Sequence, residues 1–529
     1  MFCDVIRLPD AAVMDHGDGF VKTHHQGNTF SSGQTTLLCE EADGGVKLTV
    51  CGGDISYICL RWRGSFAPGS RFMGDAVERG YGDLEWRGLS PERVMWWYFL
   101  AHGGGQTAGY GVKVRPGAFC FWLADAGGVT LWLDLRCGAL PVQLAQRRLH
   151  TATVIQTLSQ PGENAFALQK RFCGLMCTDA LSVSEPVYGS NNWYYAYGRS
   201  SQAEILDDAK LIAELSAGLP NKPYMVIDDG WQESSALCGT CNGGPYRRGN
   251  YLFPDIERLA QDMRAEGTKP GIWVRPTQNM DCFLPESWFL TRDRNRCLDL
   301  SIPDVRGYIA QEMQRVASWG YELVKFDFSY YDMMGYFARE ANHKLTRPGW
   351  AYAHRDQTNA EIAMDFYRIV KDNTNGAVLI GCNSVGHLGA GLFHVHRSGN
   401  DTSGRKWERT RKMGANTMAF RMAQHKTFFE VDADCVGVTP MVPWVQNEKW
   451  LRLLALSGTV LFASIQRSAL QDDMVKSLKW AMAQGAAQTH TAEPLDWMDN
   501  TTPERWLING TEQRFEWFND EADVPRYDL

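Results

Sequence analysis

A lysine and an aspartate close an apolar segment near the middle of the chain. Residues 321–328 read YELVKFDF, which is typical of a buried strand, and the segment ends on Lys325 and Asp327. Side chains two residues apart on a strand point to the same side, so an ammonium group and a carboxylate face in one direction. The positive charge favours the ionised form of Asp327. An ionised carboxylate at neutral pH is what a nucleophile needs.

Other apolar segments also end in polar or aromatic side chains. In YMVIDDGW, KPGIWVRP, AVLIGCNS and LFHVHRSGND these are Asp228, Asp229, Trp231, Trp273, Arg275, Cys382, Asn383, Arg397 and Asp401. Carboxylates accept hydrogen bonds from sugar hydroxyl groups, lysine and arginine donate to them, and tryptophan packs on the C–H face of a sugar ring. A pocket that collects these side chains would suit a polyhydroxylated neutral ligand.

Two carboxylates on different segments are the minimum machinery for glycoside hydrolysis. One attacks the sugar or guides water, and the other protonates the leaving oxygen. We expect Asp327 to be the nucleophile and Asp401 the acid/base. Taken singly, each has another interpretation: Asp327 could cap a helix or form a structural ion pair, and Asp401 could be a turn residue. Arg275 and Arg397, taken singly, could be structural.

The elements that would position these residues alternate along the chain. From about residue 191, apolar strands and helical segments follow one another at intervals of roughly 35–50 residues, which predicts a (β/α)8 barrel over residues 186–487. The carboxyl ends of barrel strands build the active site in this architecture. A doubly wound open sheet is the alternative, but no G-x-G-x-x-G loop follows any strand.

The two ends of the chain show a different sequence pattern. Residues 1–185 show short alternating apolar runs broken by glycine, and they predict an antiparallel β-sandwich in which only SPERVMWWYFL hints at a helix. Residues 488–529 predict a short β region. The fold class is therefore α/β, with a barrel between a sandwich and a small β segment.

Composition excludes several classes of partner. A net charge of −8 argues against nucleic acid, and no run of about 18 apolar residues predicts a membrane span. The N-terminus is charged where a signal peptide would be apolar, which favours the cytoplasm. We expect the cysteines to be free thiols, because a zinc site needs four ligands and Cys238 and Cys241 supply only two. His387, His394 and His396 are unevenly spaced, so no metal site and no cofactor are predicted.

Several motifs in order, over about residues 191–470, resemble glycoside hydrolase family 36 and its clan D relatives. They are YMVIDDGWQ, KPGIWVRP, CLDLSIPDVRGYI and ELVKFDF. The resemblance implies that Asp327 is the nucleophile in K-x-D and Asp401 the acid/base four residues after Arg397. It also implies that Asp228 and Asp229 hold galactose O4 and O6.

NNWYYAYG resembles the first barrel strand of the family. In the function that we expect, Trp193, Trp231 and Trp273 would shape the pocket wall, and Lys325 and Arg397 would donate to ring hydroxyl groups. The chain departs from the family pattern in three motifs. It has WVRPTQ where many members have F-E-P-E, GCNSVGHLGAG where many have C-S-S-G-G-G-R, and HRSGND where many have W-T-S-D.

The expected function is therefore that of a retaining, exo-acting α-galactosidase acting on an α-galactoside or related oligosaccharide. Its two carboxyl groups should lie roughly 5–5.5 Å apart. Two alternatives share the chemistry: an α-N-acetylgalactosaminidase, and a transglycosidase like the raffinose synthases. A barrel that binds sugar without cleaving it is a third. A homo-oligomer is possible, because family relatives often assemble.

Overall fold

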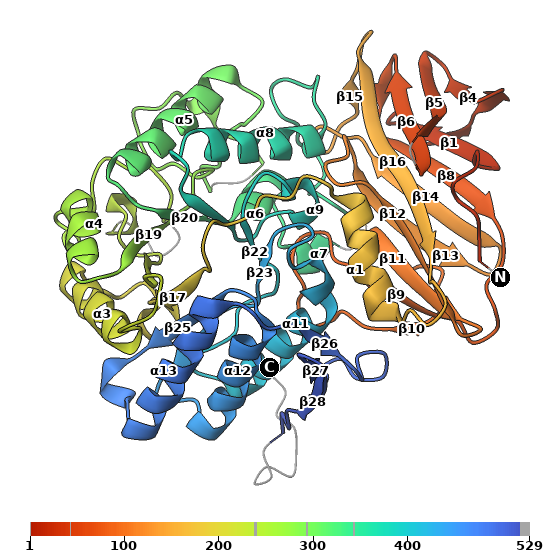
Figure 1. Ribbon diagram of the computed structural model, residues 1–529. Helices are drawn as coiled ribbons and strands as arrows, with labels where there is room; N and C mark the ends of the chain where they lie inside the picture. Colours follow the sequence, from red (N-terminus) through yellow and green to blue (C-terminus); the bar gives the residue numbers. More distant parts are fainter. Residues whose placement is uncertain (1, 43, 237–240, 293–294, 342–343, 519–529) are drawn as a thin grey trace.

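The computed structural model describes residues 2–42, 44–236, 241–292, 295–341 and 344–518. Three parts follow one another along the chain (Figure 1): an antiparallel N-terminal sheet, a barrel of parallel strands, and a small antiparallel sheet. The predicted fold class is confirmed. The predicted domain boundaries stay a prediction.

The N-terminal part contains strands that alternate buried and partly exposed side chains, as in β5. Within the described residues, fourteen of them form one antiparallel sheet, in which the order is β2-β1-β8-β14-β13-β11-β12-β16-β6-β5-β4-β3, with β9 against β11 and β10 against β9. β7 and β15 pair separately. The strands are β1 (Ala11–Asp15), β2 (Phe20–Lys22), β3 (His24–Gln26), β4 (Thr29–Ser32), β5 (Thr35–Ala42), β6 (Gly45–Cys51), β7 (Asp54–Ile55), β8 (Tyr57–Arg63), β9 (Arg71–Asp75), β10 (Arg87–Gly88), β11 (Met95–Gly103), β12 (Gln106–Val112), β13 (Phe119–Asp125), β14 (Gly128–Asp134), β15 (Val142–Gln143) and β16 (Arg148–Leu158).

Two local features of this part differ from the sequence interpretation. The segment SPERVMWWYFL, which hinted at a helix, contributes most of strand β11, because its aromatic and aliphatic side chains are buried between paired neighbours β9 and β12. A helix that the sequence did not predict, α1 (Ala165–Met176), packs against β12. Asn164 caps it by accepting a hydrogen bond from the Ala167 backbone NH at 2.8 Å.

The barrel sheet is entirely parallel and runs in the order β23-β22-β21-β20-β19-β18-β17-β25-β24. Its two end strands, β23 and β24, are consecutive along the chain, so the segment that holds them joins both edges and closes the sheet. The strands are β17 (Tyr188–Asn191), β18 (Tyr224–Ile227), β19 (Lys269–Val274), β20 (Leu323–Phe326), β21 (Val378–Gly381), β22 (Val395–Arg397), β23 (Glu430–Asp432), β24 (Val436–Val438) and β25 (Leu461–Ile465).

Helices cover the outside of this barrel. The longer ones are α3 (Gln202–Leu215), α4 (Ile256–Ala265), α5 (Pro303–Ser318), α8 (Asn359–Asp372) and α12 (Trp444–Ser457). Shorter helical segments lie in the loops: α2 (Trp193–Ala196), η1 (Glu233–Ala236), η2 (Glu286–Trp288), α6 (Ser329–Met334), α7 (Ala338–Ala341), α9 (Gly386–Gly389), α10 (Trp407–Thr410), α11 (Asn416–Arg421), η4 (Met422–Gln424) and η5 (Arg467–Ala469). Helices α10 and α11 are joined by a π-helical turn, η3 (Arg411–Ala415).

The prediction for the first barrel strand was wrong by a few residues. NNWYYAYG is not the strand: β17 ends at Asn191, and helix α2 begins at Trp193. The side-chain oxygen of Asn191 accepts a hydrogen bond from the Trp193 backbone NH at 3.0 Å. This local turn ends the extended backbone.

Helix α13 (Asp472–Ala487) follows the last barrel strand and packs against α12, α3 and β17 of the barrel. The C-terminal part contains strands β26 (Ala492–Pro494), β27 (Arg505–Ile508) and β28 (Thr511–Arg514). It lies beside the N-terminal sheet: Arg71 Nη1 is 2.6 Å from Asp499 Oδ1, and the rings of Trp86 and Trp497 meet edge to face. Among the described residues, no helix is both long enough and apolar enough to span a bilayer.

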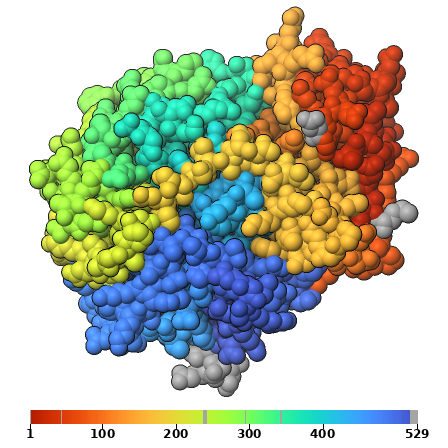
Figure 2. Space-filling view, viewed as in Figure 1, coloured from red at the N-terminus to blue at the C-terminus, as the bar shows by residue number. Residues whose placement is uncertain are grey.

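The N-terminal part also contacts the barrel mouth directly. In the segment between β9 and β10, the Gly80 backbone NH donates to Ser398 O at 2.9 Å, and Gly80 O accepts from Asn400 NH at 2.8 Å. The first and second parts thus share a backbone pairing beside strand β22. Figure 2 shows the link between the two parts, in yellow-orange, crossing the face of the molecule toward the barrel.

Candidate active site

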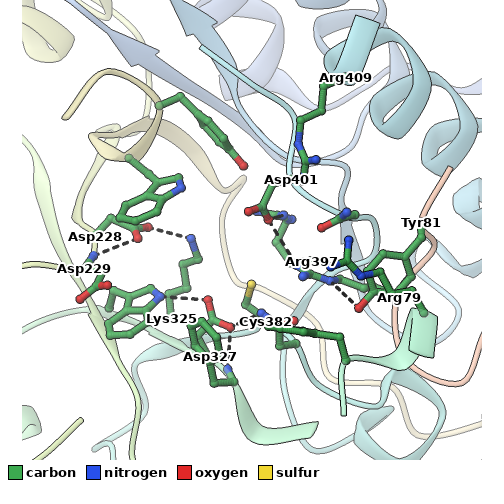
Figure 3. A pocket seen from close by; sticks show the side chains of 18 residues that line it. Arg79, Tyr81, Asp228, Asp229, Lys325, Asp327, Cys382, Arg397, Asp401 and Arg409 are labelled. Atoms are coloured by element: carbon green, nitrogen blue, oxygen red, sulfur yellow. Dashed lines mark hydrogen bonds and ion pairs between the residues drawn. The ribbon is translucent and has the colours of Figure 1, made fainter. Parts of the chain in front are cut away.

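A pocket opens at the carboxyl ends of the barrel strands, with a volume of about 250 Å³. This is slightly below the range of about 300–1,000 Å³ that is typical of ligand pockets, and it suits a small ligand such as one sugar unit. Its lining residues are Arg79, Tyr81, Trp193, Tyr194, Asp228, Asp229, Trp273, Lys325, Asp327, Phe328, Phe337, Arg339, Cys382, Asn383, Arg397, Asn400, Asp401 and Arg409. Asp327 and Asp401 therefore belong to the same pocket (Figure 3).

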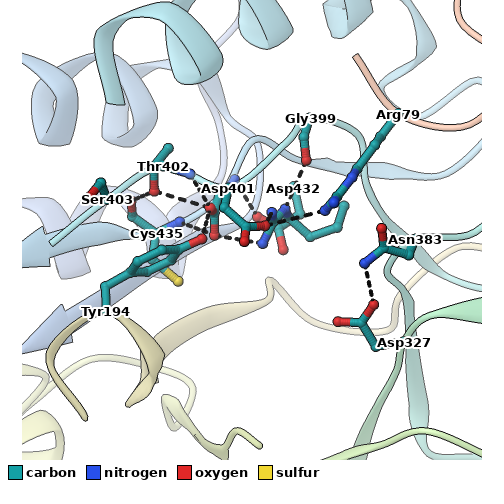
Figure 4. Close-up of polar contacts among 12 residues, drawn as sticks. Arg79, Tyr194, Asp327, Asn383, Gly399, Asp401, Thr402, Ser403, Asp432 and Cys435 are labelled. Atoms are coloured by element: carbon teal, nitrogen blue, oxygen red, sulfur yellow. Dashed lines mark hydrogen bonds and ion pairs between the residues drawn. The ribbon is translucent and has the colours of Figure 1, made fainter. Parts of the chain in front are cut away.

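Asp327 is held in place by one donor from its own segment and by two donors from neighbouring segments. Its Oδ1 accepts hydrogen bonds from the Phe328 backbone NH at 2.6 Å and from Asn383 Nδ2 at 2.5 Å, and its Oδ2 accepts from Trp273 Nε1 at 3.0 Å. Figure 4 shows Asn383 aimed at this carboxylate. These bonds fix the orientation of a buried carboxylate that faces the pocket.

The charge state of Asp327 follows from its neighbours. Burial raises the pKa of Asp327, but the Lys325 ammonium, the Asn383 hydrogen bond and the Arg79 charge together outweigh burial and bring the pKa below its ordinary value. The expected influence of Lys325 is therefore present. Its direct ion pair, however, is with Asp228, whose Oδ2 lies 2.7 Å from Lys325 Nζ.

Asp228 and Asp229 form the opposite wall, immediately after β18. Asp228 also accepts from Asn191 Nδ2 at 2.6 Å, so its carboxylate is fully engaged. Asp229 Oδ2 accepts from Asn242 Nδ2 at 2.7 Å, whereas its Oδ1 has no partner among the described residues. Burial raises the pKa of Asp229 to about 7, and the adjacent Asp228 charge adds to the effect.

Two residues that line the pocket each carry a buried acceptor atom without a hydrogen-bond partner in the described residues: Asp229 Oδ1 and Asn383 Oδ1. A buried polar atom without a hydrogen bond costs free energy, so such atoms usually mark a place that a ligand or water fills. Sugar hydroxyl groups are suitable donors for both.

Asp401 sits among arginines. Its Oδ1 lies 2.7 Å from Arg397 Nη2 and 3.3 Å from Arg79 Nη1 (Figure 4). Burial raises the pKa of the Asp401 carboxyl, but the guanidinium groups of Arg79, Arg397 and Arg409 outweigh burial and hold the pKa well below its usual range. Arg397 is itself anchored on Asp434, with Nη1 2.8 Å from Oδ1.

Ten of the twelve predicted site residues line the pocket, and two do not. Trp231 is completely buried in the wall behind it, where its Nε1 donates to Trp273 O at 2.8 Å. Arg275 forms a buried bidentate pair with Asp332, at 2.6 and 2.9 Å. The structure does not bring Trp231 and Arg275 into this pocket, because both side chains are engaged by other protein groups.

The sequence interpretation missed eight lining residues. They are Arg79, Tyr81, Tyr194, Phe328, Phe337, Arg339, Asn400 and Arg409. Phe328, Tyr194 and Asn400 adjoin residues that were predicted, so their neighbourhood could have indicated them. Arg79 and Tyr81 belong to the N-terminal part, and no barrel rule points to that segment.

The described residues contain no group of three or more histidine, cysteine, aspartate or glutamate side chains that could hold a metal ion. His387 and His396 are buried, and burial lowers the pKa of each to about 3. Cys238 lies outside the described residues. Cys241 is disulfide-bonded, so the expectation of free thiols was wrong for this residue.

Comparison with known proteins identifies the architecture. No protein-family model matches the sequence, and no curated protein matches it significantly. An α-galactosidase from Thermus thermophilus, solved with p-nitrophenyl α-D-galactopyranoside, matches with a TM-score of 0.62 at 16% identity, over 93% of this chain and 99% of that one. The chain has the fold of the family 36 α-galactosidases.

Two further structures extend this likeness. The family 36 α-galactosidase AgaA from Geobacillus stearothermophilus, solved with stachyose, gives a TM-score of 0.59 at 15% identity, over 90% of this chain and 71% of that one. An α-galactosidase from Lactobacillus brevis gives 0.59 at 12% identity, over 93% and 75%. The family 36 fold thus includes the N-terminal sheet as well as the barrel.

Proposed function

We propose that this protein is a retaining, exo-acting α-galactosidase that removes terminal α-linked galactose from oligosaccharides or glycoconjugates. The observation that carries the proposal is that Asp327 and Asp401 line one pocket at the barrel mouth, in a fold whose solved examples include α-galactosidases. A pocket of about 250 Å³ at the barrel mouth favours a single terminal sugar over the interior of a chain.

The sugar would lie with its non-reducing end toward Asp228 and Asp229. The side chains of Asp229 and Asn383 would take hydrogen bonds from ring hydroxyl groups, and Lys325 and Arg397 would donate to them. Trp193 and Trp273 would cover the apolar ring faces. In this orientation the anomeric carbon comes to Asp327 and the leaving group points toward Asp401.

The reaction would proceed by double displacement. Asp327 attacks the anomeric carbon while the bond to the leaving oxygen breaks and Asp401 donates a proton to that oxygen. Asp401 then takes a proton from water, whose oxygen attacks the same carbon and releases Asp327. The low pKa of Asp327 supports its part, because the nucleophile must be ionised.

The test is the kinetics and stereochemistry of 4-nitrophenyl α-galactoside cleavage. NMR should detect α-galactose as the first product. Asp327→Ala should lower turnover at least about 10³-fold, and azide should restore activity with formation of β-galactosyl azide. Asp262→Ala, which changes a carboxylate on the outer helix α4, should keep native activity. Near-native turnover by Asp327→Ala would refute the mechanism.

A substrate panel decides the sugar. Aryl α-glycosides of galactose, N-acetylgalactosamine and glucose should be compared, with the galactoside expected to give the highest kcat/KM. Product analysis with an added sugar acceptor separates hydrolysis from transfer. Preference for the N-acetylgalactosaminide, or transfer products that exceed free galactose, would replace the proposed activity by one of the two related ones.

A further inference from the structure

A buried carboxylate outside the pocket, that of Asp434, collects hydrogen bonds from several segments. It follows strand β23 and does not line the cavity. Its Oδ1 accepts from Arg397 Nη1 at 2.8 Å and from the Cys435 backbone NH at 2.7 Å. Its Oδ2 accepts from the Tyr194 hydroxyl, and from the backbone NH and the hydroxyl of Thr402 at 2.7 and 3.1 Å. Both oxygens are engaged, so the carboxylate is held in one orientation.

The backbone at Asp434 is also unusual. Its φ of 83° lies in the left-handed region, which residues other than glycine adopt uncommonly. Such conformations persist where the surroundings fix them, and they gather at functional sites. The Asp434 backbone NH donates to Asp432 Oδ1 at 2.8 Å, which adds a backbone contact to those of the side chain. The turn after β23 is thus fixed by its contacts and lies beside the proposed catalytic machinery.

Two of the Asp434 contacts lead directly to Asp401. Arg397 binds Asp434 through Nη1 and Asp401 Oδ1 through Nη2, the latter at 2.7 Å. Thr402 is the next residue after Asp401, and its backbone NH is held by Asp434. Figure 4 shows Tyr194, Thr402 and Cys435 gathered beside Asp401. One carboxylate therefore supports the side chain of Asp401 through Arg397 and the backbone of Asp401 through Thr402.

The contacts of Asp401 itself leave one of its oxygens available. Arg397 and Arg79 both bind Oδ1, at 2.7 and 3.3 Å, whereas no described residue donates a hydrogen bond to Oδ2. A general acid needs one oxygen that can carry a proton and meet the leaving group. Fixing Oδ1 restricts the rotation of the carboxyl group and so determines where Oδ2 lies.

From this geometry, and resting on the function proposed above, we propose that Asp434 is a positioning residue for the acid/base Asp401. It would act through Arg397 and Thr402, which hold Asp401 so that Oδ2 meets the glycosidic oxygen. Asp434 would not touch the substrate. Such support matters, because a displacement of a reacting group by about 1 Å can lower a rate about 10²-fold.

The charge of Asp434 would act in the same direction. The Arg397 guanidinium lies between two carboxylates, so part of its charge is compensated by Asp434. Arg79, Arg397 and Arg409 already hold the pKa of Asp401 well below its usual range. Without the Asp434 charge, Arg397 would favour the ionised form of Asp401 more strongly. Asp401 would then carry the proton for the first step less often.

The experiment replaces Asp434 by asparagine, which keeps the size of the side chain and also tolerates a positive φ. The full chain is assayed with 2,4-dinitrophenyl, 4-nitrophenyl and phenyl α-galactosides. Phenol is a poor leaving group and needs a proton, whereas dinitrophenol does not. In Asp434→Asn, kcat/KM should fall at least about 30-fold for the phenyl compound and less than about threefold for the dinitrophenyl compound.

The matched control is Asp134→Asn. Asp134 is a buried carboxylate of the N-terminal sheet that pairs with Arg136 at 2.6 Å. This variant should lose stability and keep the native ratio of phenyl to dinitrophenyl kcat/KM, because it lies away from Asp401. A similar loss for all three galactosides in Asp434→Asn would overturn the positioning role and leave the proposed α-galactosidase activity intact.

A second variant decides the case if Asp434→Asn does not fold. Thr402→Val keeps the shape of the side chain and the charge of Asp434, and removes only the hydroxyl donor. It should lower kcat/KM for the phenyl compound at least about threefold relative to the dinitrophenyl compound. An unchanged ratio in the folded Thr402→Val protein would then overturn the positioning role.

If the native protein cleaves none of the three galactosides, the proposed activity fails, and crystal structures still decide the positioning. The native protein is compared with Asp434→Asn, or with Thr402→Val if Asp434→Asn does not fold. A displaced Asp401 carboxyl group, or loss of its contact with Arg397, supports the proposal. An Asp401 side chain that keeps its native position and its contact with Arg397 overturns it.

Discussion

Lys325 Nζ lies 2.7 Å from Asp228 Oδ2, so the lysine that precedes Asp327 by two residues pairs with a carboxylate from a different barrel strand. Both side chains are buried. The pair balances the charge of Asp228 and still lowers the pKa of Asp327 through space. One cation therefore serves the sugar-binding wall and the proposed nucleophile together.

Asp228→Asn should destabilise the fold by removing one partner of this buried pair. The expected loss is about 3–5 kcal/mol, because Lys325 would remain buried without its counter-charge. Urea unfolding measures it. The matched control is Asp125→Asn, which breaks the half-exposed pair with Arg61 and should cost about 0–1 kcal/mol. Equal losses of stability in the two variants would show that the buried ion pair stabilises the fold no more than the half-exposed pair does.

Trp273 and Trp231 should respond differently to replacement by phenylalanine. Trp273→Phe removes the Nε1 donor to Asp327, so the pKa of Asp327 should rise and the acid limb of the kcat/KM profile should move to higher pH. Trp231→Phe leaves Trp273 O without its donor, and we expect a loss of about 1–3 kcal/mol of stability with a nearly native KM. A raised KM in Trp231→Phe would indicate that Trp231 contributes to substrate binding.

Arg275 should behave as a structural residue. Asp332→Asn removes the charge that the buried Arg275 guanidinium pairs with, and we expect a stability loss of about 3–5 kcal/mol. The KM of the folded enzyme should stay within about twofold of native. Thermal unfolding and steady-state kinetics on the same preparation separate the effects, and a large KM change at unchanged stability would contradict this assignment.

The sequence predicted the barrel and most of its pocket, because two features can be inferred from a short segment: the alternation of side chains between the two faces of a strand, and the residue at which the strand ends. Asp327 follows the last residue of β20, yet its backbone NH still bonds to Val274 O of the neighbouring strand, so the alternation that begins with Lys325 continues. Arg275 follows β19 in the same way, but its NH donates to the Tyr246 hydroxyl instead. The pairing between the strands ends there, the alternation of side chains between the two faces stops, and the Arg275 side chain turns to Asp332.

The sequence interpretation missed Arg79 and Tyr81 for a different reason. Arg79 and Tyr81 reach the pocket only because the segment between β9 and β10 pairs with the backbone around Gly399. That contact joins residues more than 300 positions apart, and neither segment carries a local pattern that indicates the other. A sequence pattern indicates which side chains one strand directs to each of its faces. Which side chains a second domain contributes to the pocket depends on how the two domains pack.

Asp229→Asn should make the protein more stable above neutral pH. The folded state raises the pKa of Asp229 to about 7, so its burial contributes favourably at low pH and this contribution is lost as the pH rises through 7. The variant cannot ionise, and we expect a gain of about 0.5–2 kcal/mol at pH 8 that shrinks toward pH 5. Urea unfolding across this range tests it, and a gain that grows toward pH 5 would contradict the raised pKa. The KM for galactosides should rise.

Arg79→Gln should move the alkaline limb of the kcat/KM profile to higher pH. Arg79 lowers the pKa of Asp401, so its removal raises that pKa and keeps Asp401 protonated to a higher pH, by about one unit. Arg79→Lys keeps the positive charge and should leave the limb near its native position. The profiles should be recorded with a neutral aryl galactoside. If the limb stays where it is in Arg79→Gln, or moves to lower pH, Asp401 is not the group whose protonation limits the reaction.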